Sequence, residues 1–540
     1  MPSPAAMLGR AALAALALCL LLAAAAGPAL AADGRQLFAS GDPFAGVFDG
    51  YSLCQPDADG TTLAFVATPL PDNGVTRDSR VWVAEFSSGE AWPVRPGAYP
   101  DVVPGQQAAP TVASPEPGTV VVVWEQADSH EPGYWDTDLW IWWGDEYGQP
   151  ATGFPKPLVT GPAFTNQTQP SLGVVNVNGE QHLVLAWQDD RDNGPLAPLV
   201  YALDLTDVDV AAPGYDAATA GVCLDPSTHG QYRPSVGPKG VVWVDTRTDN
   251  ADGCMSSLRY CTFATGQPVT AAFYSVRNEW DDVDSPAATL SGAAFLGPSM
   301  AGGPFQPWHK ALGGTAGAIA VLFDPGEIDA VCRTGSSACT RLAMTGRHGA
   351  TDTDYDVFFW DSRVQQTVPV CTVGSSDFTE RDRLGQSDLA VALGPSTGST
   401  VVWADARHNP VGTAPEDLTT RLWAASVPAV GLSADRTTVA LGRSVTFTAT
   451  VRPGMPTRTV RFQRGTRYSD PLYGFVRYKG WTTLATKRLS SSSSATWKWV
   501  PKKRGTYWFR VQSSAATLTI DGVTRAFVAA PSRVLKVVVK

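Results

Sequence analysis

The chain has 540 residues and a formal net charge of −10 at pH 7. This length exceeds what a single hydrophobic core usually supports, so we expect two or more domains. After the N-terminal segment, no apolar run approaches the ~20 residues of a membrane-spanning helix. Beyond the N-terminal segment, the sequence therefore predicts no membrane-spanning helix.

Residues 1–31 have the pattern of a secretory signal peptide. Arg10 precedes a long apolar run, and the small-residue site Ala29-Leu30-Ala31 follows it. The alternative is an uncleaved anchor helix, but the clear cleavage site favours removal. We therefore expect a secreted or cell-envelope-associated protein with no membrane span after cleavage.

From residue 35 to 426 the chain is made of repeated units. Runs rich in Val, Ile, Leu and Trp, bounded by Gly, Pro and Asp, predict short strands and almost no helix. Three of these runs end in Trp-x-Asp-x-Arg, and Gln-x-x-Pro precedes two of them and a weaker third copy. The motif residues are Trp187, Asp189, Arg191, Trp243, Asp245, Arg247, Trp403, Asp405 and Arg407. A repeat on this scale predicts supersecondary units that bury their apolar faces against one another.

The spacing of the aromatic residue that ends each second strand gives the number of units. Six such aromatics can be aligned, at Phe65, Trp124, Trp187, Trp243, Phe323 and Trp403. We therefore predict six four-stranded units, with insertions at 286–316 and 332–339. Seven is the alternative, if 286–305 is a unit of its own.

These motifs resemble the TolB-like six-bladed β-propellers of exported bacterial proteins. The resemblance is carried by Gln-x-x-Pro, by Val-Val-Trp-x-Asp-x-Arg, by third strands such as LVYALDL, and by CQPDADGTTLAFVA at 54–67. It implies a propeller over residues 35–426. It says little about function, because propellers serve binding, assembly and catalysis alike.

The recurring Asp and Arg favour a structural role, because a catalytic group is needed once. Gly-x-Ser-x-Gly and Asp-box turns are absent, which excludes the peptidases that join a propeller to a hydrolase domain and the sialidases. A glycosidase would need two or three carboxylates in the channel, for which Asp101, Asp281, Asp282 and Glu327 are candidates. We predict no cofactor, with calcium as the weaker alternative. The segments 249–253 and 352–356 resemble fragments of calcium loops but lack the full ligand spacing, so ordinary turns are favoured.

Seven cysteines remain after cleavage of the signal peptide, as expected for disulfides with one thiol left over. Two pairs, Cys254/Cys261 and Cys332/Cys339, flank short Gly- and Ser-rich segments, and we predict a disulfide in each. The pairing of Cys54, Cys223 and Cys371 stays open. A zinc site is the weaker alternative, because no Cys-x-x-Cys occurs.

Residues 428–540 differ sharply in charge and pattern. They hold 20 Lys and Arg against 3 Asp and Glu, a net charge of +17, which leaves −27 for residues 1–427. Seven alternating strands in this segment predict an all-β sandwich, and phrases such as LGRSVTFTATVRP resemble bacterial immunoglobulin-like modules. A basic cluster beside aromatics could contact a polyanion; its members are Lys498, Lys502, Lys503 and Arg504. An anionic envelope polymer or sugar is favoured over nucleic acid, and a solvated strand face is the simplest alternative.

Two functions remain. The first is an exported binding or scaffold protein, with the acidic propeller as an interaction surface and the basic sandwich as a tether; the lack of a catalytic motif favours it. The second is a carbohydrate-active hydrolase with its site at one mouth of the channel. Carboxylates with aromatics in the channel would favour the hydrolase, and small residues with backbone would favour the binder.

Overall fold

The computed structural model is all-β, and every regular element in the residues that it describes is a strand. It describes residues 35–540 with gaps: most of 35–246 and 419–540, and mainly the strands between 256 and 405. The predicted signal peptide lies outside the described residues. Within them there is no helix long and apolar enough to cross a membrane.

Residues 35–428 form antiparallel sheets of four strands, taken in chain order. The first strands are β2 (Tyr51–Asp59), β6 (Gln107–Ala113), β10 (Gln167–Val177), β14 (Gln231–Gly237), β18 (Asp284–Thr289), β22 (Ile328–Val331) and β26 (Leu389–Gly394). The second strands are β3 (Thr62–Pro69), β7 (Thr119–Glu131), β11 (Glu180–Asp189), β15 (Gly240–Asp245), β19 (Gly292–Pro298), β23 (Arg341–Gly346) and β27 (Gly398–Asp405). The third strands are β4 (Arg80–Glu85), β8 (Tyr134–Asp145), β12 (Leu199–Asp204), β16 (Ser257–Ala264), β20 (Phe305–Ala311), β24 (Asp356–Asp361) and β28 (Arg421–Ala434). The outer strands are β5 (Glu90–Pro93), β9 (Lys156–Val159), β13 (Val222–Cys223), β17 (Gln267–Phe273), β21 (Ala316–Ala318) and β25 (Gln366–Cys371), and β1 (Arg35–Gln36) takes this place in the last sheet.

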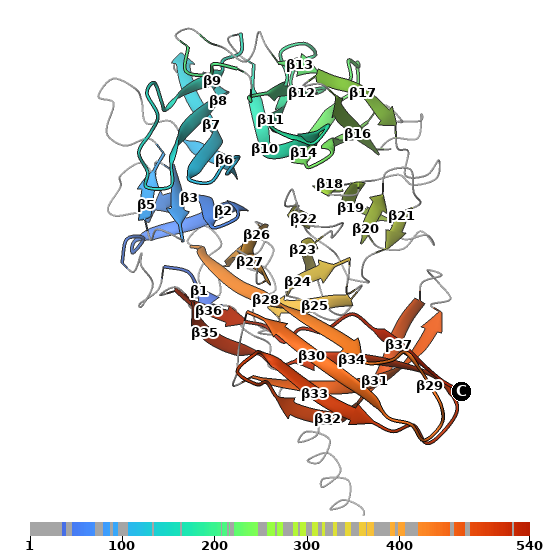
Figure 1. The fold of residues 1–540 in the computed structure, drawn as a ribbon. Helices are drawn as coiled ribbons and strands as arrows, with labels where there is room; N and C mark the ends of the chain where they lie inside the picture. Colours follow the sequence, from blue (N-terminus) through green and yellow to red (C-terminus); the bar gives the residue numbers. More distant parts are fainter. Residues whose placement is uncertain are drawn as a thin grey trace, which may run out of the picture.

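The sheets form a closed ring (Figure 1). Each first strand contacts the first strand of the next sheet, and β26 of the last sheet contacts β2 of the first. The chain closes the ring with β1, which pairs with β28 through Arg35↔Ala424 and Gln36↔Trp423. The N-terminal strand thus completes the sheet that the chain makes last, so that the ring has no open gap at this point.

The described residues contain seven such four-stranded units, one more than the six predicted from the aromatic spacing. The additional sheet is β18 to β21, which overlaps the segment named above as the alternative. Its strands read DSPAAT and GAAFLGP, and such small side chains give almost no strand signal. The second strands described in this part of the chain are β19 and β23, and Phe323, which the aromatic spacing placed in a second strand, lies outside the described residues.

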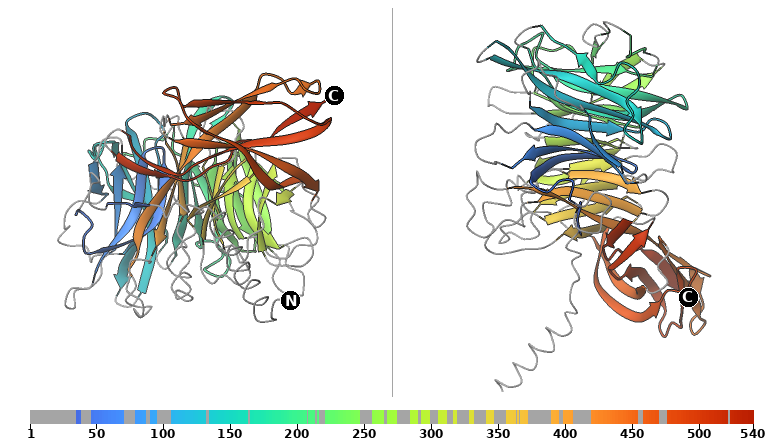
Figure 2. Two further views of the ribbon diagram at one scale, coloured as in Figure 1. Left: turned by 90° about the horizontal axis from the view of Figure 1, so that it is seen from below. Right: turned by 90° about the vertical axis from the view of Figure 1, so that its left-hand side faces the viewer.

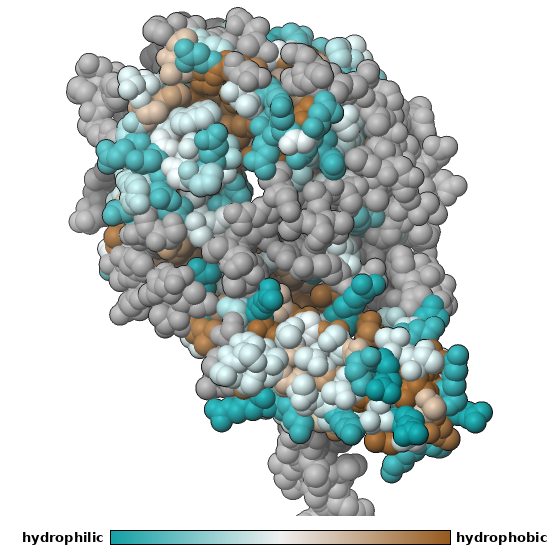
Figure 3. Space-filling view, viewed as in Figure 1, coloured by the Kyte–Doolittle hydropathy of each residue, from teal (hydrophilic) through white to brown (hydrophobic). Residues whose placement is uncertain are grey.

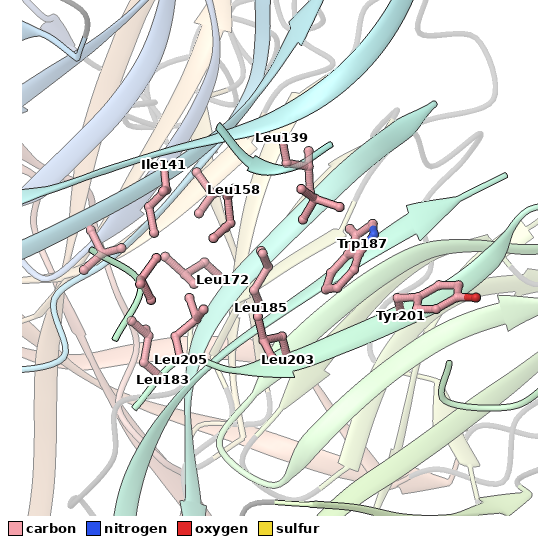
Figure 4. Close-up of a cluster of buried hydrophobic side chains, with 14 of the residues drawn as sticks. Leu139, Ile141, Leu158, Leu172, Leu183, Leu185, Trp187, Tyr201, Leu203 and Leu205 are labelled. Atoms are coloured by element: carbon pink, nitrogen blue, oxygen red, sulfur yellow. The ribbon is translucent and has the colours of Figure 1, made fainter. Parts of the chain in front are cut away.

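Apolar clusters between neighbouring sheets hold the ring together. In one of them Leu139, Ile141 and Leu158 of the second sheet face Leu172 and Leu185 of the third (Figure 4). Each fully buried side chain of this kind stabilises the fold by about 1.5–3 kcal/mol. Equivalent clusters fill the other junctions, including the one between the last and the first sheet.

After the ring, the chain forms two further sheets over a common core, here called the C-terminal sheets. One contains the second half of β28 with β30 and β33, and the other has the order β29-β37-β34-β31-β32. Their strands are β29 (Thr438–Val439), β30 (Val445–Arg452), β31 (Thr459–Ser469), β32 (Val476–Arg488), β33 (Ser494–Trp499), β34 (Gly505–Ser513) and β37 (Leu535–Val539). A hairpin of β35 (Ala516–Ile520) and β36 (Val523–Phe527) joins β28 near the ring.

The C-terminal sheets lie at the rim of the ring, beside its last sheets (Figures 1 and 2). The boundary that we placed at 426–428 falls inside β28, because this strand pairs with β27 up to Pro428 and with β30 from Ala429 onward. Val528 and Ala530 also pack into the cluster between the sixth and seventh sheets. The two parts therefore share one strand and one apolar cluster.

Candidate functional site

The Gln-x-x-Pro segments of three sheets, and the equivalent prolines Pro56 and Pro286 of two others, lie in the innermost strands and form a repeated bulge. In five sheets the register of the first strand shifts next to this point. The residue before the proline has a positive φ in each of them: Gln55 (49°), Ala109 (45°), Gln169 (50°), Arg233 (53°) and Ser285 (44°). This conformation costs a non-glycine residue on the order of 1–3 kcal/mol, so its surroundings must hold it in place.

The residue after the proline supplies one of these restraints. Its side-chain oxygen accepts a hydrogen bond from a backbone N–H of the next sheet. The pairs are Asp57 Oδ2 with Val112 N (2.7 Å), Thr111 Oγ1 with Leu172 N (3.0 Å), Ser171 Oγ with Val236 N (3.0 Å) and Ser235 Oγ with Ala288 N (2.9 Å). The repeat thus links five consecutive sheets around the channel.

A second row of bonds uses the residue before the proline. The backbone N of Ala109 donates to Oε1 of Gln55 (2.8 Å), and the backbone N of Arg233 donates to Oε1 of Gln169 (3.0 Å). The side chain of Ala109 has no acceptor for the next sheet. Oε1 of Glu125 accepts the hydrogen bond from the backbone N of Gln169 instead (2.6 Å). Burial raises the pKa of Glu125.

The glutamine of the motif joins neighbouring sheets in another way. Oε1 of Gln231 accepts from the backbone N of Val200 in the preceding sheet (3.0 Å), while its Nε2 lies 3.4 Å from Oδ2 of Asp245. Gln107 makes the same bond to the backbone N of Val81 (2.7 Å). The glutamine of the motif therefore connects neighbouring sheets, a role that the sequence did not reveal.

The first strands surround a cavity of about 520 Å³. It opens among the turns that connect first and second strands, and its volume is typical of small-ligand sites. Of its 29 lining residues, 14 are Gly, Ala, Ser or Thr, and none is aromatic. The carboxylates that line it are Asp57, Asp59, Glu85, Glu116, Glu146 and Asp329.

The first sheet breaks the symmetry of this channel. Asp57 stands where the next three sheets have Thr111, Ser171 and Ser235, and two residues further on Asp59 stands where the third sheet has Gly173. One acid therefore replaces the hydroxyl that the repeat carries at this position. Departures of this kind from a structural repeat are expected at functional groups.

Asp57 is partly buried and bonded at both oxygens. Oδ1 accepts from the backbone N of Ala58 (2.9 Å), and Oδ2 accepts from Val112 N. Burial nevertheless raises its pKa from 3.8 to about 6, and the nearby charge of Asp59 adds to the rise, while the backbone bonds oppose it. Near neutral pH this carboxyl can therefore exchange a proton.

Two further acids beside Asp57 are fixed by hydrogen bonds. Oδ2 of Asp59 accepts from the backbone N of Ser114 (2.8 Å). The hydroxyl of Thr62 donates to Oε2 of Glu85 (2.5 Å), which is buried. The arrangement combines a proton donor at mildly acidic pH with a neighbouring fixed carboxylate.

The first Trp-x-Asp-x-Arg copy forms a closed cluster away from this cavity. Nε1 of Trp187 donates to Oδ2 of the buried Asp189 (2.9 Å), and the backbone N of Arg191 donates to its Oδ1 (3.0 Å). The Arg191 guanidinium also pairs with Asp189 and lies 5.0 Å from the ring of Tyr201. None of these residues lines the cavity.

The other two copies are described only in part. Nε1 of Trp403 donates to Oδ2 of Asp405 (3.2 Å). Asp245, which follows the buried Trp243, is itself fully buried, and its Oδ2 lies 3.7 Å from Nε of Arg259. Arg247 and Arg407 lie outside the described residues. The structural role of all nine residues therefore stays a prediction.

The disulfide predictions stay predictions, because only one of the four cysteines, Cys261, is described. Cys261 lies in β16 among the apolar side chains between two sheets, and its thiol donates to the carbonyl oxygen of Thr262 (3.4 Å). Burial raises its pKa to about 12. The predicted bridge between Cys254 and Cys261 therefore stays a prediction. Cys254, Cys332 and Cys339 lie outside the described residues.

In the basic cluster predicted at 498–504, Lys498 and its neighbour Trp497 do not share a face, and the contact of the cluster with a polyanion stays a prediction. Lys498, Lys502, Lys503 and Arg504 are exposed. Trp497, beside Lys498, packs into the core of the C-terminal sheets. Strand alternation directs the two side chains to opposite faces. Hydrophilic and hydrophobic side chains are mixed over the visible surface of these sheets (Figure 3).

The described residues contain no group of three or more His, Cys, Asp or Glu that could hold a metal ion. Segment 249–253 and residues 352–355 lie outside them, as do Asp101, Asp281, Asp282 and Glu327. The carboxylates that do line the cavity were missed. Aligning the residue after the proline would have revealed Asp57, because it is the acid in a column of hydroxyls.

No protein-family model and no curated protein matches the chain. Solved structures that it resembles include a puromycin-hydrolyzing peptidase of Mycobacterium tuberculosis (14% identity, TM-score 0.41, 78% of this chain and 64% of that one). Others are an acylaminoacyl peptidase of Pyrococcus horikoshii (9%, 0.38, 76% and 59%) and an α-L-arabinofuranosidase of Fusarium graminearum (10%, 0.35, 70% and 93%). The chain spans about three fifths of the length of the two peptidases.

Proposed function

We propose that the protein is a carbohydrate-active hydrolase whose site is the channel cavity beside the first sheet. The observation that carries the proposal is the acid Asp57, with its pKa of about 6, at a position that is a hydroxyl in the next three sheets. Glycoside hydrolysis needs one carboxyl that stays protonated and another that is ionised. Asp57 suits the first role, and Asp59, whose charge raises the pKa of Asp57, suits the second.

The rest of the lining suits a hydroxylated ligand. Ser171 and Ser235 each accept a backbone hydrogen bond through Oγ, so their hydroxyl hydrogens can be donated to a ligand, whereas the hydroxyl of Thr111 also bonds Asp57. The volume of about 520 Å³ has room for a short sugar segment. The chain's own residues would hold the ligand by polar contacts, since no aromatic lines the cavity.

Asp57→Ser is the variant that tests this proposal. It removes the carboxyl and restores the residue that the third and fourth sheets carry, so the bond to Val112 is kept. We expect release of reducing ends from a panel of plant and microbial polysaccharides at about pH 6, and its loss in this variant. Glu125→Gln is the control, because it changes an acid of the connecting bonds that does not line the cavity. Wild-type protein without activity on the panel, or an Asp57→Ser variant with full activity, would contradict the proposal.

A second candidate is the exported binding or scaffold protein. It is favoured by the two backbone bonds of Asp57, which are those of a structural connector, and by the small residues that line the channel. In that case Asp57→Ser would leave ligand binding unchanged.

We also propose a more specific assignment of the fold. Seven four-stranded sheets in a closed ring support a seven-bladed propeller of TolB-like type, one blade more than the resemblance implies. The C-terminal sheets, packed over one core, support an immunoglobulin-like sandwich. The N-terminal pattern supports export, so the site would act on substrates outside the cell.

A further inference from the structure

The outer face of the sheet β29-β37-β34-β31-β32 gathers aromatic rings and cations that the sequence did not bring together. Trp508 alternates along β34 with the core residue Phe509, so it faces outward, opposite Lys536 of β37. The ring of Tyr478 lies 5.3 Å from that of Trp508 and 6.1 Å from that of Trp481. Three rings thus form a row across β34 and β32.

Cations accompany this row. Arg467 and Lys536 lie 5.8 Å and 5.7 Å from the ring of Trp508, and Arg510 lies 4.2 Å from that of Trp481. The indole of Trp481 lies against the backbone of Gly465, where an added Cβ would come within 2.8 Å of the ring. The face is therefore built by close packing and not by chance proximity of long side chains.

One end of the row is hollow. A depression of about 380 Å³ is lined by Arg467, Tyr468, Thr506, Trp508 and Lys536. Arg467 and Lys536 are exposed and flank the same indole, and neither forms an ion pair with a described acid. Two positive charges beside one ring repel each other unless an anion lies between them.

The C-terminal segment is poor in acids, with three against 20 Lys and Arg. Among its described residues the one acid, Asp435, pairs with Arg436. An aromatic face attracts the positively polarised C–H groups of a sugar ring, and the flanking cations attract anionic groups along a chain. We propose that this face binds an anionic polysaccharide, with a sugar ring on Trp508 and its carboxylate or sulfate between Arg467 and Lys536.

The proposal does not depend on the channel site, and its test uses the full chain. The probes are polygalacturonate for carboxylated sugars, dextran sulfate for sulfated sugars, neutral dextran for rings without charge and polyglutamate for charge without rings. We expect one of the two acidic glycans to bind at low salt, neutral dextran to bind at least tenfold more weakly, and affinity to fall steeply with added salt. Polyglutamate that binds as well as the glycans would overturn the role of the rings.

The matched variants separate this face from net charge. Arg467→Ser with Lys536→Ser should weaken glycan binding roughly tenfold or more, equivalent to the loss of about 1.4 kcal/mol. Lys502→Ser with Lys503→Ser removes the same charge from an exposed turn elsewhere and should change binding by less than about threefold. Equal losses in both pairs, or no binding to either glycan, would overturn the proposal. Salt-sensitive self-association that only the Arg467 and Lys536 variant abolishes would also overturn the proposal. The face would then bind the acidic ring of sheets in a second copy of the chain.

Discussion

The carboxyl of Asp57 should cost stability at neutral pH. One pKa unit corresponds to about 1.4 kcal/mol, so a rise from 3.8 to about 6 means that its ionisation lowers the free energy of unfolding by about 3 kcal/mol. Below pH 3.8 the group is protonated in both states and carries no cost. The cost grows as the pH rises to about 6, and it stays at its full value above that.

Asp57→Ser removes this cost while keeping an oxygen for Val112 N. It loses the bond from Ala58 N, worth about 1 kcal/mol. The variant should therefore be more stable than the wild type by about 2 kcal/mol at pH 7.5, and the gain should vanish near pH 4.5.

Urea unfolding at the two pH values, followed by tryptophan fluorescence, measures the difference. Ser171→Asp is the reciprocal control. It places an acid at the equivalent position and should lose stability at pH 7.5 but much less at pH 4.5. A loss of stability in Asp57→Ser that is equal at both pH values would refute the reasoning, because the carboxyl would then be an ordinary stabilising acceptor. A gain in stability together with a loss of hydrolysis would mark Asp57 as retained for function.

Other predictions can be checked one by one. Asp245→Ala should lower the free energy of unfolding by about 1–3 kcal/mol, because it leaves buried partners without their acceptor; a change below about 0.5 kcal/mol in denaturant unfolding would contradict this. Peptide mass mapping of exported protein should find Cys332 joined to Cys339, and two alkylated thiols would exclude the bridge. Sequencing of the secreted protein should begin just after Ala31, and an intact N-terminus would instead indicate the anchor. A fragment of 428–540 should be less soluble than the full chain, because the ring normally buries Val528; a monomeric, cooperatively unfolding fragment would show that the shared cluster is dispensable.

The sequence predicted the class of fold well, because its strands carry strong local signals. Trp124, Trp187 and Trp243 were aligned correctly as residues of second strands. The sheet made by β18 to β21 was not counted as a separate unit, because small side chains such as those of Ala293 and Ala294 pack between sheets without a periodic apolar pattern. Burial there depends on the neighbouring sheets, which local sequence does not describe.

The candidate sites were harder to predict, since they depend on contacts between sheets. The Gln-x-x-Pro repeat was visible, but its role comes from hydrogen bonds to the next sheet, more than 50 residues away in the chain. In the C-terminal sheets, adjacency in sequence was misleading. Lys498 and Trp497 are neighbours on opposite faces, whereas Trp508 and Lys536 are far apart in the chain and directly opposite in the sheet.

Symmetry offers a way to separate structure from function in this chain. Residues that recur from sheet to sheet, such as Ser171 and Ser235, have a role that every junction of the ring needs. A functional group is needed at one place only, and so it should appear as a departure that the structure tolerates at some cost. Asp57 meets both conditions, because it is an acid among hydroxyls and its ionised form is disfavoured by its surroundings. Glu125 departs from the repeat too, but it replaces a missing acceptor beside Ala109 and so restores the row of bonds. The difference between these two acids is why the channel beside the first sheet, and not the second, is the place to look for chemistry.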